Sequence, residues 1–353
     1  MIDLEKLIYG AVETNGVSDI HLTVGLPPVI RRYGELTALG SAVLTGEDTE
    51  SAVKELTTPE QFETYCSAGE VDFAVTYRGK VRMRCNAFRQ QGHAALALRL
   101  LPLRIPTAKE LDLPPVIVAQ AEKPRGLVLV TGPTGSGKSS TLAALLDHIN
   151  HTDSRHIITM ESPIEYLYTP DKCVINQREV GRDTASFASG LRAALRQDPD
   201  VILVGEMRDL ETISTAITAA ETGHLVFATL HTKGAANTID RIIDTFPTDQ
   251  QNQIRIQLAD VLECAIGQTL VPKTSGGRRA VFEIMLTTPA IRSMIMQSKT
   301  FQITGAIQTG RRQGMRLLDD ALADHVRSGE VRLEDALKVA NDPETLRAVL
   351  SRP

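Results

Sequence analysis

The sequence predicts an α/β protein in which helices cover both faces of a parallel sheet. The first observation is an alternation of short apolar segments and amphipathic segments in the middle of the chain. The apolar segments have the length of strands and comprise residues 127–131, 156–160, 201–205 and 225–230. The amphipathic segments have the length of helices and comprise residues 138–150, 184–197 and 209–221. Near-continuous apolar strands separated by helices are typical of sheets buried on both sides.

A glycine-rich loop between the first of these strands and the first helix is the second observation. Residues 132–139 match the pattern G-x-x-x-x-G-K-[ST]. Glycines let the backbone curl so that several N–H groups and the helix N-terminus point at one anion. Lys138 would add positive charge for the β- and γ-phosphates, and the Ser139 hydroxyl would ligate Mg²⁺. The loop therefore predicts a nucleoside triphosphate site formed by Gly132, Pro133, Thr134, Gly135, Ser136, Gly137, Lys138, Ser139 and Ser140.

Residues 1–103 predict a separate α+β unit. Apolar residues at helical spacing indicate a first helix at Leu4–Val12, and a helix rich in Glu and Gln is expected from about Thr49 to Tyr65. Residues 18–24 alternate as a strand does, and residues 26–36 resemble a hairpin. Three further strands are expected to form an antiparallel meander, at residues 71–75, 81–88 and 94–100.

The remaining boundaries follow from proline content and periodicity. Residues 104–125 carry several prolines and are expected to be a linker to a core at residues 126–271. From residue 272 to residue 353 we expect a mainly helical region, in which residues 315–326 show an apolar stripe at 3.6-residue spacing.

Composition excludes several classes of protein. The chain has 353 residues and a net charge of −5, with no dense basic block, so nucleic-acid binding is not expected. No signal peptide is apparent, and no apolar run approaches the about 20 residues that span a bilayer. The four cysteines lie far apart and lack the paired spacing of a zinc site, which indicates a reduced, cytoplasmic protein.

Two glutamates are expected at the carboxyl ends of strands, where ligands bind in doubly wound sheets. Glu206 follows the strand at residues 201–205, and Glu161 follows the strand at residues 156–160. A nucleoside triphosphatase needs a carboxylate to hold Mg²⁺ through water or to orient the attacking water. Glu206 is the best-placed candidate, and Glu161 would lie near it.

Two histidines flank the strand at residues 225–230. His231 lies at its carboxyl end, where it would contact the γ-phosphate or relay its loss to a neighbour. His224 lies at the opposite end, about 20 Å away along an extended strand, so a zinc ion shared by the two histidines is a poor interpretation. For His224, a structural role is as good an interpretation as a functional one.

Basic residues gather in the first unit between residues 78 and 104, a segment with no acidic residue. Strand alternation places Arg82 and Arg84 on one face. A solvated strand face explains such charges as well as a second role does, in which arginines stabilise phosphate charge in trans.

Together, these segments closely resemble the type IV pilus retraction ATPases of the PilT family, among the secretion-type, RecA-like motor ATPases. The resemblance covers nearly the whole chain. Its motifs include Ser18–Leu22, Gly25–Pro28, Arg84–Phe88, the glycine-rich loop, Ile175–Val180, Leu191–Arg196, Gly205–Thr212, Ala219–Thr232, Ile239–Pro247 and Pro289–Arg292.

The resemblance implies a PAS-like N-terminal domain, a RecA-like ATPase domain that uses ATP and Mg²⁺, and a small helical C-terminal region. It implies a homohexamer in the cytoplasm, peripheral to the inner membrane. There it would act with an inner-membrane platform protein and the pilus machinery in pilus retraction. Glu161 would act on a proton or orient water, Glu206 would be the Walker B glutamate, and residues 222–232 would form the His box. Arg82, Arg84 and Arg99 would reach phosphates across a domain or subunit interface.

One position departs from the family pattern. The usual Glu-Asp-Pro reads Glu161-Ser162-Pro163 here. Loss of that carboxylate would weaken metal organisation or turnover, so a slow regulatory ATP-binding ring stays an alternative. A pilus-assembly or type II secretion ATPase is another, although this chain lacks the longer N-terminal region and the tetracysteine site usual there. A nucleic-acid motor is disfavoured by the absence of Trp and an aromatic content of 4%.

Overall fold

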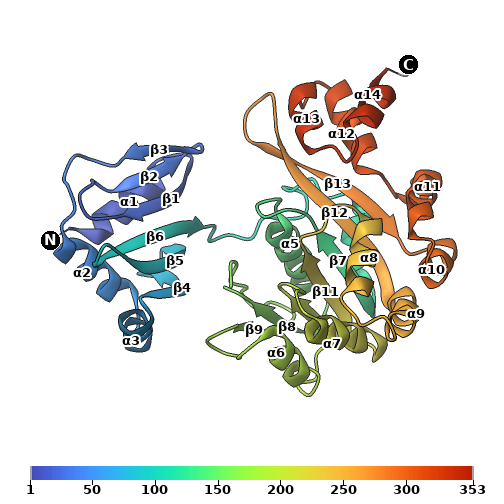
Figure 1. The fold of residues 1–353 in the computed structure, drawn as a ribbon, viewed down its shortest axis with the longest axis horizontal. Coiled ribbons are helices and arrows are strands. Elements are labelled where there is room, and N and C mark those ends of the chain that lie inside the picture. The colour runs from blue at the N-terminus through green and yellow to red at the C-terminus, as the bar shows by residue number, and fades with distance from the viewer. Residues whose placement is uncertain (1, 352–353) are drawn as a thin grey trace. The chain divides into compact units, whose positions relative to one another are not determined.

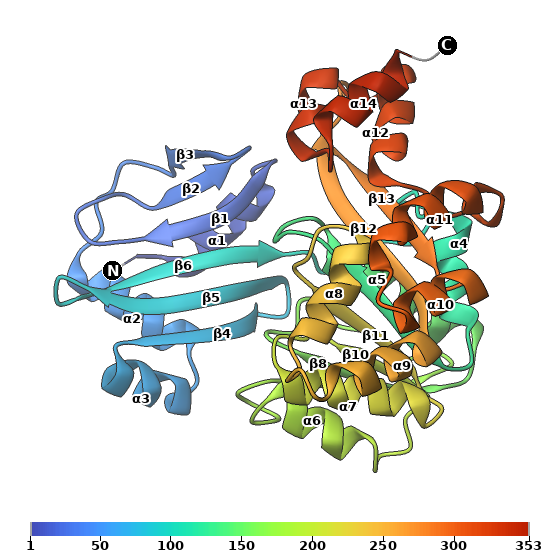
Figure 2. The same ribbon diagram turned by 45° about the vertical axis from the view of Figure 1, so that its right-hand side comes forward.

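The computed structural model describes residues 2–351, which form two compact units (Figures 1 and 2). The first unit comprises the residues up to Arg104 together with Pro163–Leu167. The second comprises Ile105–Ser162 and the chain from Tyr168 onward.

The first unit is built on a six-stranded antiparallel sheet with the order β3-β2-β1-β6-β5-β4. Its strands are β1 (Val17–Leu22), β2 (Val29–Arg32), β3 (Glu35–Ala38), β4 (Glu70–Tyr77), β5 (Val81–Gln90) and β6 (His93–Leu101). The predicted hairpin and the predicted three-stranded meander are both present. Helix α1 (Leu4–Glu13) buries Leu4, Leu7 and Ile8 as predicted, but Val12 is exposed.

The prediction of a single helix from about Thr49 to Tyr65 is wrong. The structure has two helices instead, α2 (Gly46–Leu56) and α3 (Pro59–Ala68). Thr58 is the N-cap of α3. Its hydroxyl accepts a hydrogen bond from the Gln61 amide, and the Gln61 side chain accepts one from the Thr58 amide. Such a capping box, followed by Pro59 at the first helical position, begins a new helix.

The second unit contains a seven-stranded sheet with the order β13-β12-β7-β11-β10-β8-β9. All neighbours from β12 to β9 are parallel, and β13 pairs antiparallel with β12. The predicted parallel strands are confirmed as β7 (Gly126–Thr131), β8 (His156–Glu161), β10 (Val201–Val204) and β11 (Leu225–Leu230). Strands that the sequence analysis missed are β9 (Val174–Glu179), β12 (Leu262–Pro272) and β13 (Arg278–Leu286).

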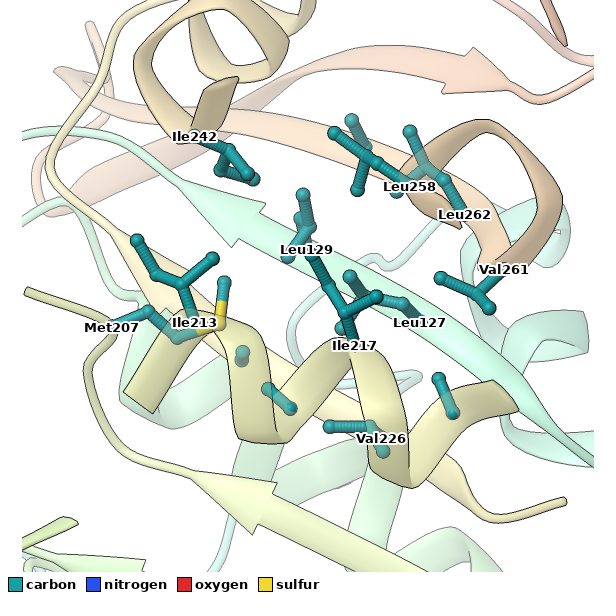
Figure 3. Packing of buried hydrophobic residues seen from close by; sticks show 14 of the residues in the cluster. Leu127, Leu129, Met207, Ile213, Ile217, Val226, Ile242, Leu258, Val261 and Leu262 are labelled. Carbon is teal, nitrogen blue, oxygen red and sulfur yellow. The ribbon is translucent and has the colours of Figure 1, made fainter. Parts of the chain in front are cut away.

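Helices cover both faces of this sheet, which confirms the predicted α/β class. They are α5 (Lys138–Thr152), α6 (Phe187–Ala194), α7 (Leu210–Glu221), α8 (Ala235–Asp244) and α9 (Gln251–Val261). Alternate residues of β7 point to opposite faces. Leu127 and Leu129 pack with Ile217 of α7 and Leu258 of α9 (Figure 3), whereas Val128 and Val130 pack with the residues of α5.

Two expected boundaries differ from the structure. Residues 105–125 belong to the second unit rather than forming a free linker, since Leu113, Ile117 and Ala121 are buried in its core. They carry the short helices α4 (Pro115–Val118) and η1 (Ala119–Glu122). The boundary expected at residue 272 falls within the β12–β13 hairpin, so the region after it begins with a strand.

The C-terminal helices follow β13. They are α10 (Pro289–Met296), α11 (Ile303–Thr309), α12 (Leu318–Arg327), α13 (Leu333–Val339) and α14 (Pro343–Leu350), with 3₁₀ turns η2 (Thr300–Gln302) and η3 (Gly310–Gln313). Leu318 and Leu322 of α12 and Leu346 of α14 pack against Val271 and Val281 at the far end of the β12–β13 hairpin. Over residues 2–351, no helix is long and apolar enough to cross a membrane.

Helix α9 offers a direct test of the packing on β7. Leu258 is completely buried and Ile256, two residues before it, is 51% exposed. We expect Leu258→Ala to lower the free energy of unfolding by about 2–5 kcal/mol, because it leaves a cavity in the core. Ile256→Ala should change it by about 0.5 kcal/mol or less. Urea denaturation followed by circular dichroism would measure both, and equal losses would contradict this assignment of the helix faces.

Candidate functional site

The glycine-rich loop connects β7 to α5 at the carboxyl edge of the parallel sheet. Gly132, Gly135 and Gly137 have φ values of +143°, +78° and +89°, a region that side-chain-bearing residues rarely adopt. Pro133, Thr134 and Gly135 form its exposed crest, and Ser136 is buried at its base. The loop ends at Lys138, the first residue of α5, so the N-terminus of a 15-residue helix opens into its concave side.

Lys138 is held inside the loop. Its Nζ atom donates to the carbonyl oxygens of Gly132 and Pro133, at 2.8 Å and 3.1 Å, and the residue is buried. These contacts keep an ammonium group beside the curled backbone, where an anion would lie. Ser139 follows on the exposed first turn of α5, and Ser140 is half-buried. Curled backbone, helix N-terminus and ammonium together fit a polyphosphate.

Glu206 lies just beyond the carboxyl end of β10, as predicted, and the side chains of Arg208 and His231 flank it. Arg208 Nε is 2.5 Å from Glu206 Oε1, and His231 Nε2 is 3.2 Å from the same oxygen. His231 follows β11, the neighbour of β10 in the sheet. Glu206 and His231 therefore meet because they follow the carboxyl ends of two adjacent parallel strands. His231 is expected to contact the γ-phosphate or to relay its loss to a neighbour, and the neighbour that it contacts in the structure is Glu206.

The surroundings of Glu206 keep it ionised. Partial burial of the carboxyl raises its pKa, but the hydrogen bonds and positive charge of Arg208 and His231 outweigh burial and leave the pKa below its usual value. Glu206 is thus a carboxylate throughout the physiological pH range. A carboxylate in this position accepts a hydrogen bond from water but is a weaker base than a free glutamate.

Glu161 is the last residue of β8, beside β10. Its Oε1 atom accepts hydrogen bonds from Thr159 Oγ1 at 2.8 Å and from Gln177 Nε2 at 3.2 Å. Ser162, the departure from the family pattern, is exposed immediately after it. Glu161 and Glu206 therefore lie at one edge of the sheet, at the ends of two adjacent strands.

Gly205 allows the ends of β8 and β10 to approach so closely. A Cβ atom on Gly205 would lie 2.9 Å from the Met160 carbonyl oxygen and 3.3 Å from Glu161 Cα. The Gly205 amide instead donates to that carbonyl at 2.8 Å. Any larger residue would push the two glutamates apart.

A cavity of about 80 Å³ lies beside the glycine-rich loop, within the second unit. Its lining includes Gly132, Gln268, Glu283 and Asn341, so it reaches from the loop to the C-terminal helices. Glu283 on β13 accepts hydrogen bonds from the Ala235 amide at 2.7 Å and from Asn341 Nδ2 at 3.1 Å. Burial raises the pKa of Glu283 despite these donors.

His224 lies at the opposite end of β11, away from the edge that carries the glycine-rich loop. Its Nδ1 atom is 2.8 Å from the Ala219 carbonyl oxygen and 3.2 Å from Thr222 Oγ1. These contacts secure the turn between α7 and β11.

The three predicted arginines have different surroundings in the first unit. Arg82 is buried, and its guanidinium donates to the Ile164 carbonyl oxygen at 2.9 Å and to Thr76 Oγ1 at 3.1 Å. Arg99 pairs with Asp19 across β1 and β6, with Nε 2.9 Å from Oδ1. Arg84, on β5, is exposed and lies opposite Arg99 on the neighbouring strand β6. The alternation that gave Arg82 and Arg84 one common face did not predict that one would be buried.

Sequence reasoning missed residues that complete the site by contact. Arg208 drew no attention by itself, because nothing in its spacing distinguishes it from a surface arginine. Gln177 lies on β9, a strand that was not predicted. Gln268 carried a usable signal, since it is an amide inside the otherwise apolar and small run Ala265–Leu270. In the structure Gln268 contacts the base of the glycine-rich loop.

A Mg²⁺ ion at a nucleotide site needs few protein ligands. Among residues 2–351 no group of three or more His, Cys, Asp or Glu side chains is arranged to hold a metal ion. Mg²⁺ at nucleotide sites commonly uses one or two protein oxygens together with phosphate oxygens and water. The exposed Ser139 hydroxyl and the Glu206 carboxylate suit that limited role.

A largely parallel sheet with this loop after an inner strand, β7, defines a P-loop nucleoside triphosphatase core. The family of type II/IV secretion system proteins matches residues 67–338. The chain belongs to this family, and it is a nucleotide-binding ATPase.

Particular relatives are similar along nearly the whole chain. The type IV pilus retraction ATPase PilT of Pseudomonas aeruginosa is 48% identical over 340 residues, which are 96% of this chain and 98% of that protein. A twitching motility protein of Neisseria gonorrhoeae is 44% identical over 320 residues, 90% of this chain and 86% of that protein. A crystal structure of the pilus retraction motor PilT with bound ADP has a TM-score of 0.92 at 45% identity, covering 99% of this chain and 100% of that one. The resemblance stated from the motifs is thereby confirmed.

The effect of Arg208 on the pKa of Glu206 should be measurable in the pH dependence of ATP hydrolysis. Arg208→Gln removes a group that lowers the pKa of Glu206, so the pKa should rise and the carboxylate should be protonated at a higher pH. We expect the acid limb of the kcat/KM profile for ATP to move to higher pH. Arg182→Gln, at an exposed arginine, is the matched control. An unmoved acid limb in Arg208→Gln would show that Arg208 does not tune Glu206.

Proposed function

We propose that this chain is a cytoplasmic, hexameric motor that couples ATP hydrolysis to the retraction of type IV pili. The observation that carries the proposal is the meeting of the glycine-rich loop, Glu206 and His231 at one sheet edge. The similarity to pilus retraction ATPases over nearly the whole chain supports the cellular role.

The glycine-rich loop binds the triphosphate in this proposal. The backbone amides of residues 132–139 and the N-terminus of α5 face the phosphates, and Lys138 exchanges its loop carbonyls for phosphate oxygens. Ser139, together with Glu206 through water, would hold Mg²⁺. Bound Mg²⁺ would supply neutralisation of charge on the phosphate oxygens.

Glu206 and Glu161 divide the work on the attacking water. Glu206 orients the water by accepting its hydrogen bond, since Arg208 and His231 keep that carboxylate charged and fixed. Glu161, which accepts hydrogen bonds from Thr159 and Gln177, would act on a proton of that water or help to orient it. His231 contacts Glu206 directly and is placed to transmit a change at the γ-phosphate to the strand end of β11.

Assembly into a ring would bring arginines of the first unit to the phosphates. Of the three candidates, we favour Arg84, because Arg82 is committed to Ile164 and Thr76 and Arg99 to Asp19. Hydrolysis should then depend on assembly, with specific activity rising with protein concentration. A fully active monomer would contradict the ring.

Location and partners follow from the same role. We propose that the ring works at the cytoplasmic face of the inner membrane, bound peripherally to a platform protein of the pilus machinery. No contact with nucleic acid is required.

Two variants separate binding from turnover. Lys138→Ala should abolish hydrolysis and weaken ATP binding, because backbone amides alone leave the phosphate charge underneutralised. Glu206→Gln should bind ATP normally while turnover falls by at least about a hundredfold, because it keeps the shape but loses the charge that orients water. Steady-state kinetics and fluorescent-nucleotide titration would measure both. Near wild-type turnover in either variant would remove that residue from the mechanism.

Retraction itself is tested in cells. Deletion of the gene should leave cells with excess surface pili and without twitching motility, because pili assemble but do not shorten. The wild-type gene should restore motility, and the Glu206→Gln gene should not. Loss of surface pili after deletion would instead indicate an assembly motor.

A further inference from the structure

Gln268 is a buried amide at the centre of the nucleotide-binding core. It lies on β12, next to β7 in the sheet, and is only 4% exposed. A buried side-chain amide needs hydrogen-bond partners at both ends, because an unsatisfied polar group in a core is costly. Gln268 finds both partners in the glycine-rich loop and the helix that follows it.

The two hydrogen bonds fix the orientation of the amide. Gln268 Nε2 donates to the Ser136 carbonyl oxygen at 2.9 Å, and Gln268 Oε1 accepts from Thr141 Oγ1 at 2.9 Å. The donor end faces the base of the loop and the acceptor end faces the first turns of α5. Gln268 therefore bridges the two parts of the structure that surround a bound phosphate.

The loop also packs directly against this residue. A Cβ atom on Gly132 would lie 2.2 Å from the Gln268 carbonyl oxygen, and one on Gly137 would lie 2.9 Å from Gln268 Nε2. Real Cβ atoms do not approach so closely. The glycines of the loop are thus required by the neighbouring strand as well as by their positive φ angles.

The bridge sets the direction of a peptide plane. In a trans peptide the carbonyl of one residue and the amide of the next point in opposite directions. Because Gln268 holds the Ser136 carbonyl toward β12, the Gly137 N–H points away from β12. That N–H is carried by Gly137, the residue immediately before α5.

We propose that Gln268 is a positioning residue that orders the glycine-rich loop for ATP. The inference rests on the proposed ATP-binding role of that loop. Gln268 touches no phosphate itself. It acts through Ser136 and Thr141, by keeping the loop curled before the nucleotide arrives, so that binding does not have to order the backbone.

Gln268→Met tests the bridge, since methionine keeps the length and loses both hydrogen bonds. We expect the KM for ATP to rise about tenfold while kcat stays within about threefold, because pre-ordering the loop aids ground state and transition state alike. In nucleotide-free protein, amide hydrogen exchange over residues 132–139 should become faster. Thr141→Val, which removes one partner only, should give a smaller change in the same direction.

Gln120→Met is the matched control. Gln120 is also buried, at 3% exposed, and donates from Nε2 to the Val116 carbonyl oxygen at 2.8 Å, outside the loop. It should leave exchange at residues 132–139 and the KM unchanged. Equal effects from Gln120→Met, or unchanged exchange and KM in both Gln268→Met and Thr141→Val, would overturn the proposal. If Gln268→Met does not fold, Thr141→Val decides alone. The exchange arm uses no ATP, so it tests the bridge even if the wild-type protein fails to retract pili.

Discussion

The parallel pairing of β7, β11, β10 and β8 is the constraint on which the rest of the site depends. The strands run in the same direction and nearly in register, with Leu230 beside Thr131 and Val204 beside Met160. Their carboxyl ends therefore open along one edge, where the glycine-rich loop, Glu161, Glu206 and His231 all follow. Both faces of β7 are buried, so this register is secured by packing as well as by hydrogen bonds.

Side chains of the same type have different electrostatic surroundings in this structure. Glu206 lies between Arg208 and His231 and stays charged, whereas Glu161 receives hydrogen bonds from Thr159 and Gln177. The arginines of the first unit divide in the same way. Arg82 satisfies a backbone carbonyl in a buried position, and Arg99 faces a cross-strand aspartate. Residue type alone does not fix the environment of these charges, because the folded structure chooses the partner of each.

The β12–β13 hairpin connects the nucleotide loop to the C-terminal helices. On β12, Gln268 contacts the loop, and its neighbour Gly267 stands opposite Glu283 on β13. Glu283 in turn accepts hydrogen bonds from the start of α8 and from Asn341. The hairpin thus places the base of the nucleotide loop and the segment between α13 and α14 on neighbouring residues of two paired strands.

The sequence by itself determined the α/β class, the four central strands, the phosphate-binding loop and the strand-end positions of Glu161, Glu206 and His231. These features depend on local periodicity and on motifs shorter than ten residues, which a linear pattern preserves. Only the tertiary structure decided the partners: Arg208 and His231 on Glu206, Gln268 against the loop, and Ile164 against Arg82. It also decided that β12 and β13 extend the sheet and that residues 105–125 join its core. The reason is physical: a contact such as Gln268 with Ser136 joins residues 132 positions apart, and only the folded packing brings them together.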